Sequence, residues 1–98
     1  MTGVEKLMDF EVSKDLKEKN GTYNVKIELG NEVGSYTREC VKVLVSSMIR
    51  NNEKGIYGDK LTMSALASKI SKDVPHWVND EDLVIQNVNI SLLKTNKR

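Results

Sequence analysis

Cysteine, proline and histidine each occur only once in this chain of 98 residues, as Cys40, Pro75 and His76. A single cysteine excludes an intramolecular disulfide framework. One cysteine and one histidine are also too few to build the His/Cys ligand sets of zinc sites. The sequence therefore predicts neither a disulfide-stabilised domain nor a zinc protein, and we expect no cofactor.

An excess of charge of one sign is also lacking. Fifteen Lys and Arg residues face fourteen Asp and Glu residues, which gives a net charge of +1. Nucleic-acid-binding domains usually carry a clear basic excess, because neutralising phosphates supplies much of their affinity. The sequence also shows no long hydrophobic run and no signal peptide. We therefore expect no membrane association and a reducing, cytoplasmic location.

The residues that are present suit one small hydrophobic core, since 39% are hydrophobic and 30% are charged. Chains of this length form single domains at the lower end of the usual size range. We expect one α+β domain over residues 1–93. Residues 94–98, which contain Lys94, Lys97 and Arg98, are expected to form a flexible basic tail.

Asn20-Gly21 is the strongest hairpin signal in the chain, because a type I′ turn needs positive φ at both positions. A turn centred there predicts a β-hairpin over 10–29 and pairs Lys19 with Thr22. The register then gives three further pairs: Val12 with Leu29, Leu16 with Val25, and Asp15 with Lys26. A helix through residues 4–16 is the alternative, but it does not use the turn signal. Residues 1–9 would then be a short helical or irregular lead-in.

A helix is predicted over 36–52, with Ser35 as its N-cap and Gly55 just beyond its end. Its hydrophobic residues are Tyr36, Cys40, Val41, Val43, Leu44, Val45, Met48 and Ile49. They cover far more of the circumference than the usual apolar stripe. Such a helix needs cover on more than one side, from the sheet, a second helix or a partner chain. A strand over 41–45 is the alternative.

A second helix is predicted over 62–74, with Pro75 ending it, because proline disfavours helical backbone in the residue before it. Its hydrophobic face consists of Met63, Leu66, Ala67, Ile70 and Val74. After it, Val88, Ile90 and Leu92 alternate with polar residues, which predicts a half-buried strand over 83–93. The sequence therefore predicts an α+β fold in which an antiparallel sheet of about three strands packs against two helices.

No catalytic pattern emerges from the candidate residues. His76 has Asp73 and Asp80 near it in sequence, but an ordinary surface or half-buried histidine is the simpler interpretation. Cys40 falls on an apolar helix face, which suits a small hydrophobic residue better than a reactive thiol. The loop over 30–35 lacks the spacing and the lysine of a phosphate-binding loop. We therefore expect a non-enzymatic protein.

The segment Leu61 to Ile70, LTMSALASKI, resembles the first helix of a helix-turn-helix unit in its alanines and its Leu-Ala-x-Lys-Ile rhythm. The resemblance covers about ten residues and would make residues 61–78 a DNA-binding unit. No glycine marks the expected turn, and the segment that would enter the groove, PHWVNDEDL, carries three acids and no Lys or Arg. Acidic side chains repel phosphates, so this resemblance implies only the alternative function.

The remaining candidate site is the segment that contains His76, Trp77, Asp80, Glu81 and Asp82. Trp77 either closes the core between the second helix and the last strand or anchors a protein partner, since one tryptophan can desolvate a large area. Together with the widely apolar first helix, this segment favours a small binding or regulatory protein that acts through a protein–protein interface. A homodimer is one form that such an interface can take.

Overall fold

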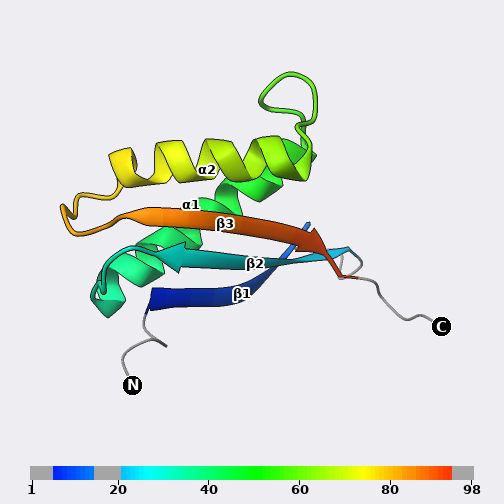
Figure 1. Ribbon diagram of the computed structural model, residues 1–98. Helices are drawn as coiled ribbons and strands as arrows, with labels where there is room; N and C mark the ends of the chain where they lie inside the picture. The colour runs from blue at the N-terminus through cyan, green and yellow to red at the C-terminus, as the bar shows by residue number, and fades with distance from the viewer. Residues whose placement is uncertain (1–5, 15–20, 94–98) are drawn as a thin grey trace.

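The computed structural model describes residues 6–14 and 21–93 and shows an α+β fold (Figure 1). Its elements are β1 (Leu7–Ser13), β2 (Thr22–Leu29), α1 (Ser35–Glu53), α2 (Met63–Trp77) and β3 (Ile85–Leu92). The three strands form one antiparallel sheet in the order β1-β2-β3, so β2 is central. The predicted fold class and the order of the elements are confirmed.

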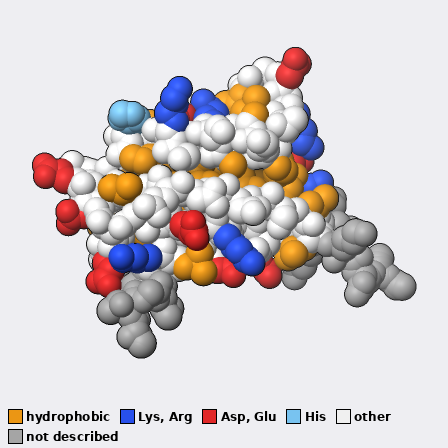
Figure 2. Space-filling view, in the orientation of Figure 1, with side chains coloured by type: hydrophobic (Ala, Val, Ile, Leu, Met, Phe, Trp, Pro, Cys, Tyr) orange, Lys and Arg blue, Asp and Glu red, His pale blue; other side chains and the backbone are white. Residues whose placement is uncertain are grey.

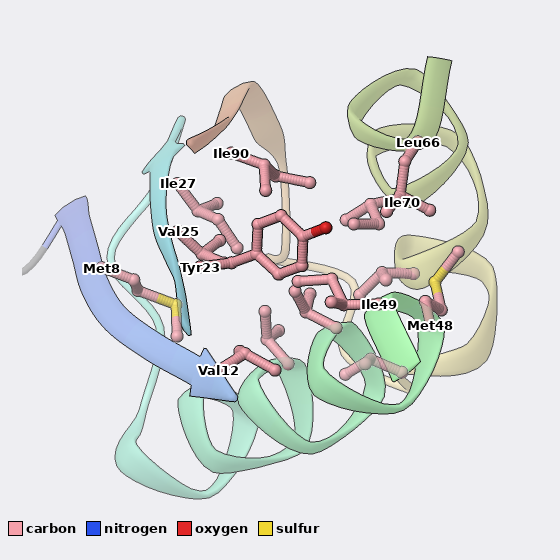
Figure 3. Packing of buried hydrophobic residues seen from close by; sticks show 14 of the residues in the cluster. Met8, Val12, Tyr23, Val25, Ile27, Met48, Ile49, Leu66, Ile70 and Ile90 are labelled. Atoms are coloured by element: carbon pink, nitrogen blue, oxygen red, sulfur yellow. The ribbon is translucent and has the colours of Figure 1, made fainter. Parts of the chain in front are cut away.

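The core lies between the sheet and the two helices. Alternate residues of β2 from Tyr23 to Leu29 are buried on the helical side, while Lys26 and Glu28 on the other side are exposed. α2 packs along β3, and α1 contacts both β1 and α2. Figure 3 shows Ile70 and Leu66 of α2 and Ile49 of α1 converging on Tyr23, Val25 and Ile27 of the sheet. The hydrophobic alternation of the strands therefore determines which face the helices cover.

The predicted hairpin register is wrong. Val12 pairs with Tyr23 rather than with Leu29, and Lys26 pairs with Asp9. The amide of Lys14 donates to the carbonyl of Gly21 over 3.1 Å, which closes the paired strands well before Asn20. β1 therefore begins at Leu7 instead of residue 10. The predicted partners Asp15, Leu16 and Lys19 lie outside the described residues.

Burial explains the shift of register. The run KDLKEK over 14–19 offers one hydrophobic residue, whereas 7–12 offer four. With β1 over Leu7–Ser13, Met8 and Val12 are almost completely buried. Burying two such side chains contributes a few kcal/mol, more than the preference of an Asn-Gly pair for a tight turn. The shift of the partner from Leu29 to Tyr23 is even in number, so Val12 lies on the same face of the sheet in either register.

α1 extends beyond both of its predicted limits, 36 and 52. α1 starts at Ser35 itself, and its N-cap is Gly34, which makes no side-chain capping hydrogen bond. The expected role of Ser35 as N-cap is therefore wrong by one residue. At the other end Gly55 has a φ of +74°, the left-handed conformation expected just beyond a helix.

Pro75 lies inside α2 instead of ending it, and the helix continues to Trp77. The amide of Val78 still donates to the carbonyl of Val74 over 3.0 Å. Val74 and Val78 are both buried, so packing on each side of the proline holds the chain in a helix. The missing amide of proline removes one intrahelical hydrogen bond, a loss that the last turn tolerates. Trp77 is consequently a helical residue.

β3 is shorter than predicted, and its last hydrophobic residue is not half-buried. Ile90 is buried and Val88 is partly buried, as the alternation predicts, but Leu92 is 52% exposed. α2 begins at Met63, which lines the same groove as Ile90. Leu92 lies beyond that point, where the helix no longer covers the sheet.

A partly buried hydrogen bond joins the middle strand to the end of α1. The Tyr23 hydroxyl donates to the Glu53 carboxylate over 2.5 Å, and Glu53 also accepts from Lys60 over 3.1 Å. Burial, with Glu53 nearby, raises the pKa of Tyr23. For Glu53, burial alone would raise the pKa, but the bonds from Tyr23 and Lys60 outweigh it and lower the pKa. The pair is therefore most stabilising between the ordinary pKa values of the two groups, 4.5 and 10.0.

Replacing Tyr23 with phenylalanine is expected to lower the free energy of unfolding at neutral pH by about 1–2 kcal/mol, because it removes this bond and leaves a carboxylate short of a donor. The difference between wild type and variant should shrink above pH 10.0. Above this pH, Tyr23 of the unfolded wild type loses its proton while Tyr23 of the folded protein keeps it, which favours the unfolded state. It should also shrink as acid protonates Glu53. Urea denaturation across this pH range measures both trends. Tyr36→Phe is the matched control, since Tyr36 is 82% exposed and should show no difference.

Candidate functional site

Trp77 stands at the end of α2 and borders a groove between α2 and α1. The groove has a volume of about 510 Å³. Its lining residues are Tyr36, Thr37, Glu39, Cys40, Val43, Leu44, Trp77, Val78 and Asn79, which together we call the Trp77 groove. Trp77 is 54% exposed, whereas Val78 and Leu83 are buried and complete the core at this end. The interpretation of Trp77 as a residue that closes the core is therefore wrong.

Hydrophobic residues of α1 that the core does not cover form the other wall of this groove. Tyr36 is 82% exposed and Val43 is 65% exposed, two turns apart on the same side of the helix. Cys40, between them, is partly buried, as is Leu44. We expected this wide apolar surface to be covered on more than one side. Within the part of the chain that the structure describes, the sheet and α2 cover only the side that contains Val41, Val45 and Ile49.

At one end of the Trp77 groove, Asp80 links the segment after α2 to α1 through hydrogen bonds. Its carboxylate accepts from the Thr37 hydroxyl of α1 over 2.5 Å and from the backbone amide of Asp82 over 2.9 Å. The bond from Thr37, followed by that from Asp82, lowers the pKa of Asp80. Asp80 therefore remains ionised in mild acid and connects the segment after α2 to the first turn of α1.

The other two acidic residues of the segment have exposed side chains. Glu81 and Asp82 occupy a turn, and the carbonyl of Asp82 accepts from the side chain of Asn31 over 3.2 Å. Glu39 of α1 lines the groove itself, and Asp80 and Glu81 line the adjoining hollow. Glu39 pairs with Lys42, but both side chains are exposed and 3.8 Å apart, so this pair contributes little.

His76 does not share the groove with Trp77. It is exposed and lines a neighbouring hollow with Pro75, Asp80 and Glu81. Asp73, its other acidic neighbour in the sequence, instead pairs with Lys69 over 3.1 Å. The structure thus places Trp77 against α1, and His76 with the acidic turn on the adjoining surface.

Among the residues that the structure describes, no cluster of three or more His, Cys, Asp or Glu side chains has the geometry to hold a metal ion. Neither described helix is long and apolar enough to cross a bilayer.

The helix-turn-helix alternative requires a second helix directly after α2. Residues 78–84 instead form turns and irregular backbone, and β3 follows. The first three residues of the segment that would enter a DNA groove, Pro75 to Trp77, belong to α2 itself. This geometry does not support DNA binding through residues 61–78.

Sequence reasoning found Trp77 but did not connect it to Tyr36, Cys40, Val43 and Leu44. The signal was present as the excess apolar width of the first helix. The position of this apolar surface beside Trp77 depends on how the two helices pack.

Comparison of the chain with protein-family models, curated proteins and solved structures finds no match.

Proposed function

We propose that this protein is a small non-enzymatic binding or regulatory protein that holds a hydrophobic segment of a protein partner in the Trp77 groove. The observation that carries the proposal is the convergence of three large exposed side chains, Tyr36, Val43 and Trp77, on one groove. Single exposed hydrophobic residues are common, but a cluster with polar residues around it is typical of a binding surface.

The energetics favour Trp77 as the centre of the interface. A tryptophan side chain buries 150–250 Å² in a complete interface, and more than half of this one is exposed in the free protein. Aromatic residues in desolvated pockets supply most of the binding energy in many complexes. Because Trp77 is part of α2, its backbone is already ordered before a partner binds, which lowers the entropic cost of association.

The acidic surroundings indicate the chemistry of the partner. Glu39 lines the groove, and Asp80 and Glu81 line the adjoining hollow. A segment with hydrophobic side chains in its centre and Lys or Arg at its ends would complement both features. The expected partner is therefore a protein segment and not a nucleic acid. The near-neutral net charge of this chain, +1, does not prevent it from binding such a segment.

Trp77→Ala is expected to abolish retention of the partner while changing the free energy of unfolding by less than about 1 kcal/mol, because the side chain is largely exposed. The measurement is a pull-down from lysate of the source cells with the tagged chain, alongside thermal unfolding of each variant. Ile56→Ala is the matched control, since Ile56 is 62% exposed but lies outside the groove. It should retain the partner at the wild-type level.

Retention of the same protein by Trp77→Ala would contradict the proposal. A fall of several kcal/mol in the free energy of unfolding would also contradict it, if partner binding is lost only because the variant unfolds. Treating the lysate with nuclease tests the alternative function. Retained material that disappears with nuclease, with an affinity that falls steeply with salt, would indicate nucleic-acid binding instead. Sedimentation of the purified chain tests a further case, in which a Trp77-dependent dimer would identify a second copy as the partner.

A further inference from the structure

Within the described residues, β3 presents a free edge on the side of the sheet away from β2. The amide of Leu93 donates to the carbonyl of Thr22 over 2.8 Å, and the register pairs Asn89 with Lys26. In an antiparallel pair the residues alternate between bonding to the partner strand and facing away from it. The backbone groups of Asn89 therefore point to β2, and those of Val88 and Ile90 point outward. Among the described residues, β3 pairs with β2 alone.

The two edges of the sheet differ in charge. β1, the other edge, carries Asp9 and Glu11. β3, over Ile85–Leu92, contains no charged residue and no proline. Charged side chains and proline are the usual features that prevent an edge strand from pairing with another chain. The β3 edge lacks them and is therefore open to strand addition.

α2 leaves room beside this edge. Ser64, Ala67, Ser68 and Ser71 form a wall of small side chains opposite residues 86–90 of β3, and the groove between them has a volume of about 440 Å³. We call it the α2/β3 groove. Figure 2 shows a band of hydrophobic and uncharged atoms along the line between α2 and β3, with charged side chains above and below it. A neutral groove with free backbone donors and acceptors suits a neutral extended chain.

We infer that the α2/β3 groove binds an extended, uncharged segment of a partner protein, which adds to β3 as a fourth strand. Its backbone would pair with the outward-facing amides and carbonyls of Val88 and Ile90, which is the general mode of peptide recognition by strand addition. On one side its side chains would meet the small wall of α2, so residues there must be small. On the other side they would join the polar open face beside Asn87 and Asn89.

Antiparallel pairing with β3 of a second copy of this chain would fill the same groove less well. It would place the two copies of α2, each lying along its own β3, on the same face of the sheet and over strands about 4.8 Å apart. Packed helices need about 8–10 Å between their axes. A segment that brings no helix of its own avoids this clash.

The test uses a phage-displayed library of linear ten-residue peptides, selected on the full chain, with the selected peptide then synthesised. Ser68→Arg should weaken its binding by at least about tenfold, because the long side chain fills the groove. Ala65→Arg is the matched control, since it adds the same charge to an exposed position of α2 outside the groove, and it should bind as the wild type does. Both variants should unfold at the wild-type temperature, since arginine is a good helix former.

Amide hydrogen exchange supplies the decisive readout. The amides of Val88 and Ile90 should slow by at least about tenfold on peptide binding as they gain hydrogen-bond partners, while Asn89, already bonded to β2, should change little. Failure to select any peptide would overturn the inference, as would a peptide that binds Ser68→Arg normally. Peptides that require Trp77 instead would also overturn it, while supporting the function proposed for the Trp77 groove.

Discussion

Replacing Asn52 with alanine is expected to lower the free energy of unfolding by about 2–3 kcal/mol, because it leaves two backbone groups without partners. Asn52 is 1% exposed near the end of α1. Its side-chain amide donates to the carbonyl of Leu61 over 3.1 Å, and its side-chain oxygen accepts from the amide of Leu61 over 2.8 Å. These two hydrogen bonds from one side chain to the backbone of Leu61 fix the connection that leads into α2. Urea denaturation at neutral pH measures the loss.

Asn51→Ala is the matched control, because it makes the same chemical change one residue earlier at a partly exposed position. It should be close to neutral, since alanine favours a helix. Asn52→Asp should be at least as damaging as alanine, because a buried carboxylate can accept from Leu61 but cannot donate to it. Equal stability of the Asn51 and Asn52 alanine variants would show that the Leu61 contact contributes nothing.

Leu66→Ala is expected to cost about 2–5 kcal/mol, the range for deleting a fully buried leucine. Leu66 is 0% exposed and packs α2 against the sheet. Small domains are stable by only about 5–15 kcal/mol, so this change removes a large part of the total. Thermal and urea denaturation should both show the loss. Because α2 carries Trp77 and also the small wall of the α2/β3 groove, loosening it should weaken binding at both grooves.

Ser64→Ala provides the control on the same helix. Ser64 is exposed, so its replacement should leave stability unchanged or raise it by about 0.5 kcal/mol through helix propensity. A Leu66→Ala protein with wild-type stability would mean that α2 is not held by this packing. The positions assigned to Trp77 and to the wall of the α2/β3 groove would then lose their basis.

The sequence was sufficient to predict the type of every regular element and most buried faces. On α2, three residues of the predicted apolar face, Leu66, Ile70 and Val74, are completely buried. On β3, the period-two alternation of Val88 and Ile90 with polar residues likewise matches their burial. These predictions succeed because helix and strand periodicity are properties of the local chain, and any core must use the resulting face.

The register of β1 could not be predicted from the turn signal. Asn20-Gly21 favours a tight hairpin, but the burial of Met8 and Val12 against the helices selects pairing six residues away. The predicted end of α2 was wrong for a similar reason. The local preference of the residue before Pro75 is overcome by the packing of Val74 and Val78. In both cases tertiary contacts contribute more free energy than the local signal.

The sequence by itself determined the α+β class, the order of the elements and the presence of more hydrophobic surface on α1 than one core contact can use. The tertiary structure alone decided where that surface lies. Continuing α2 through Pro75 carries Trp77 alongside Tyr36 and Val43 of α1, and packing α2 along β3 creates the α2/β3 groove. Periodicity reports which side of one element is apolar, but only the packing of elements against each other shows which apolar sides remain uncovered.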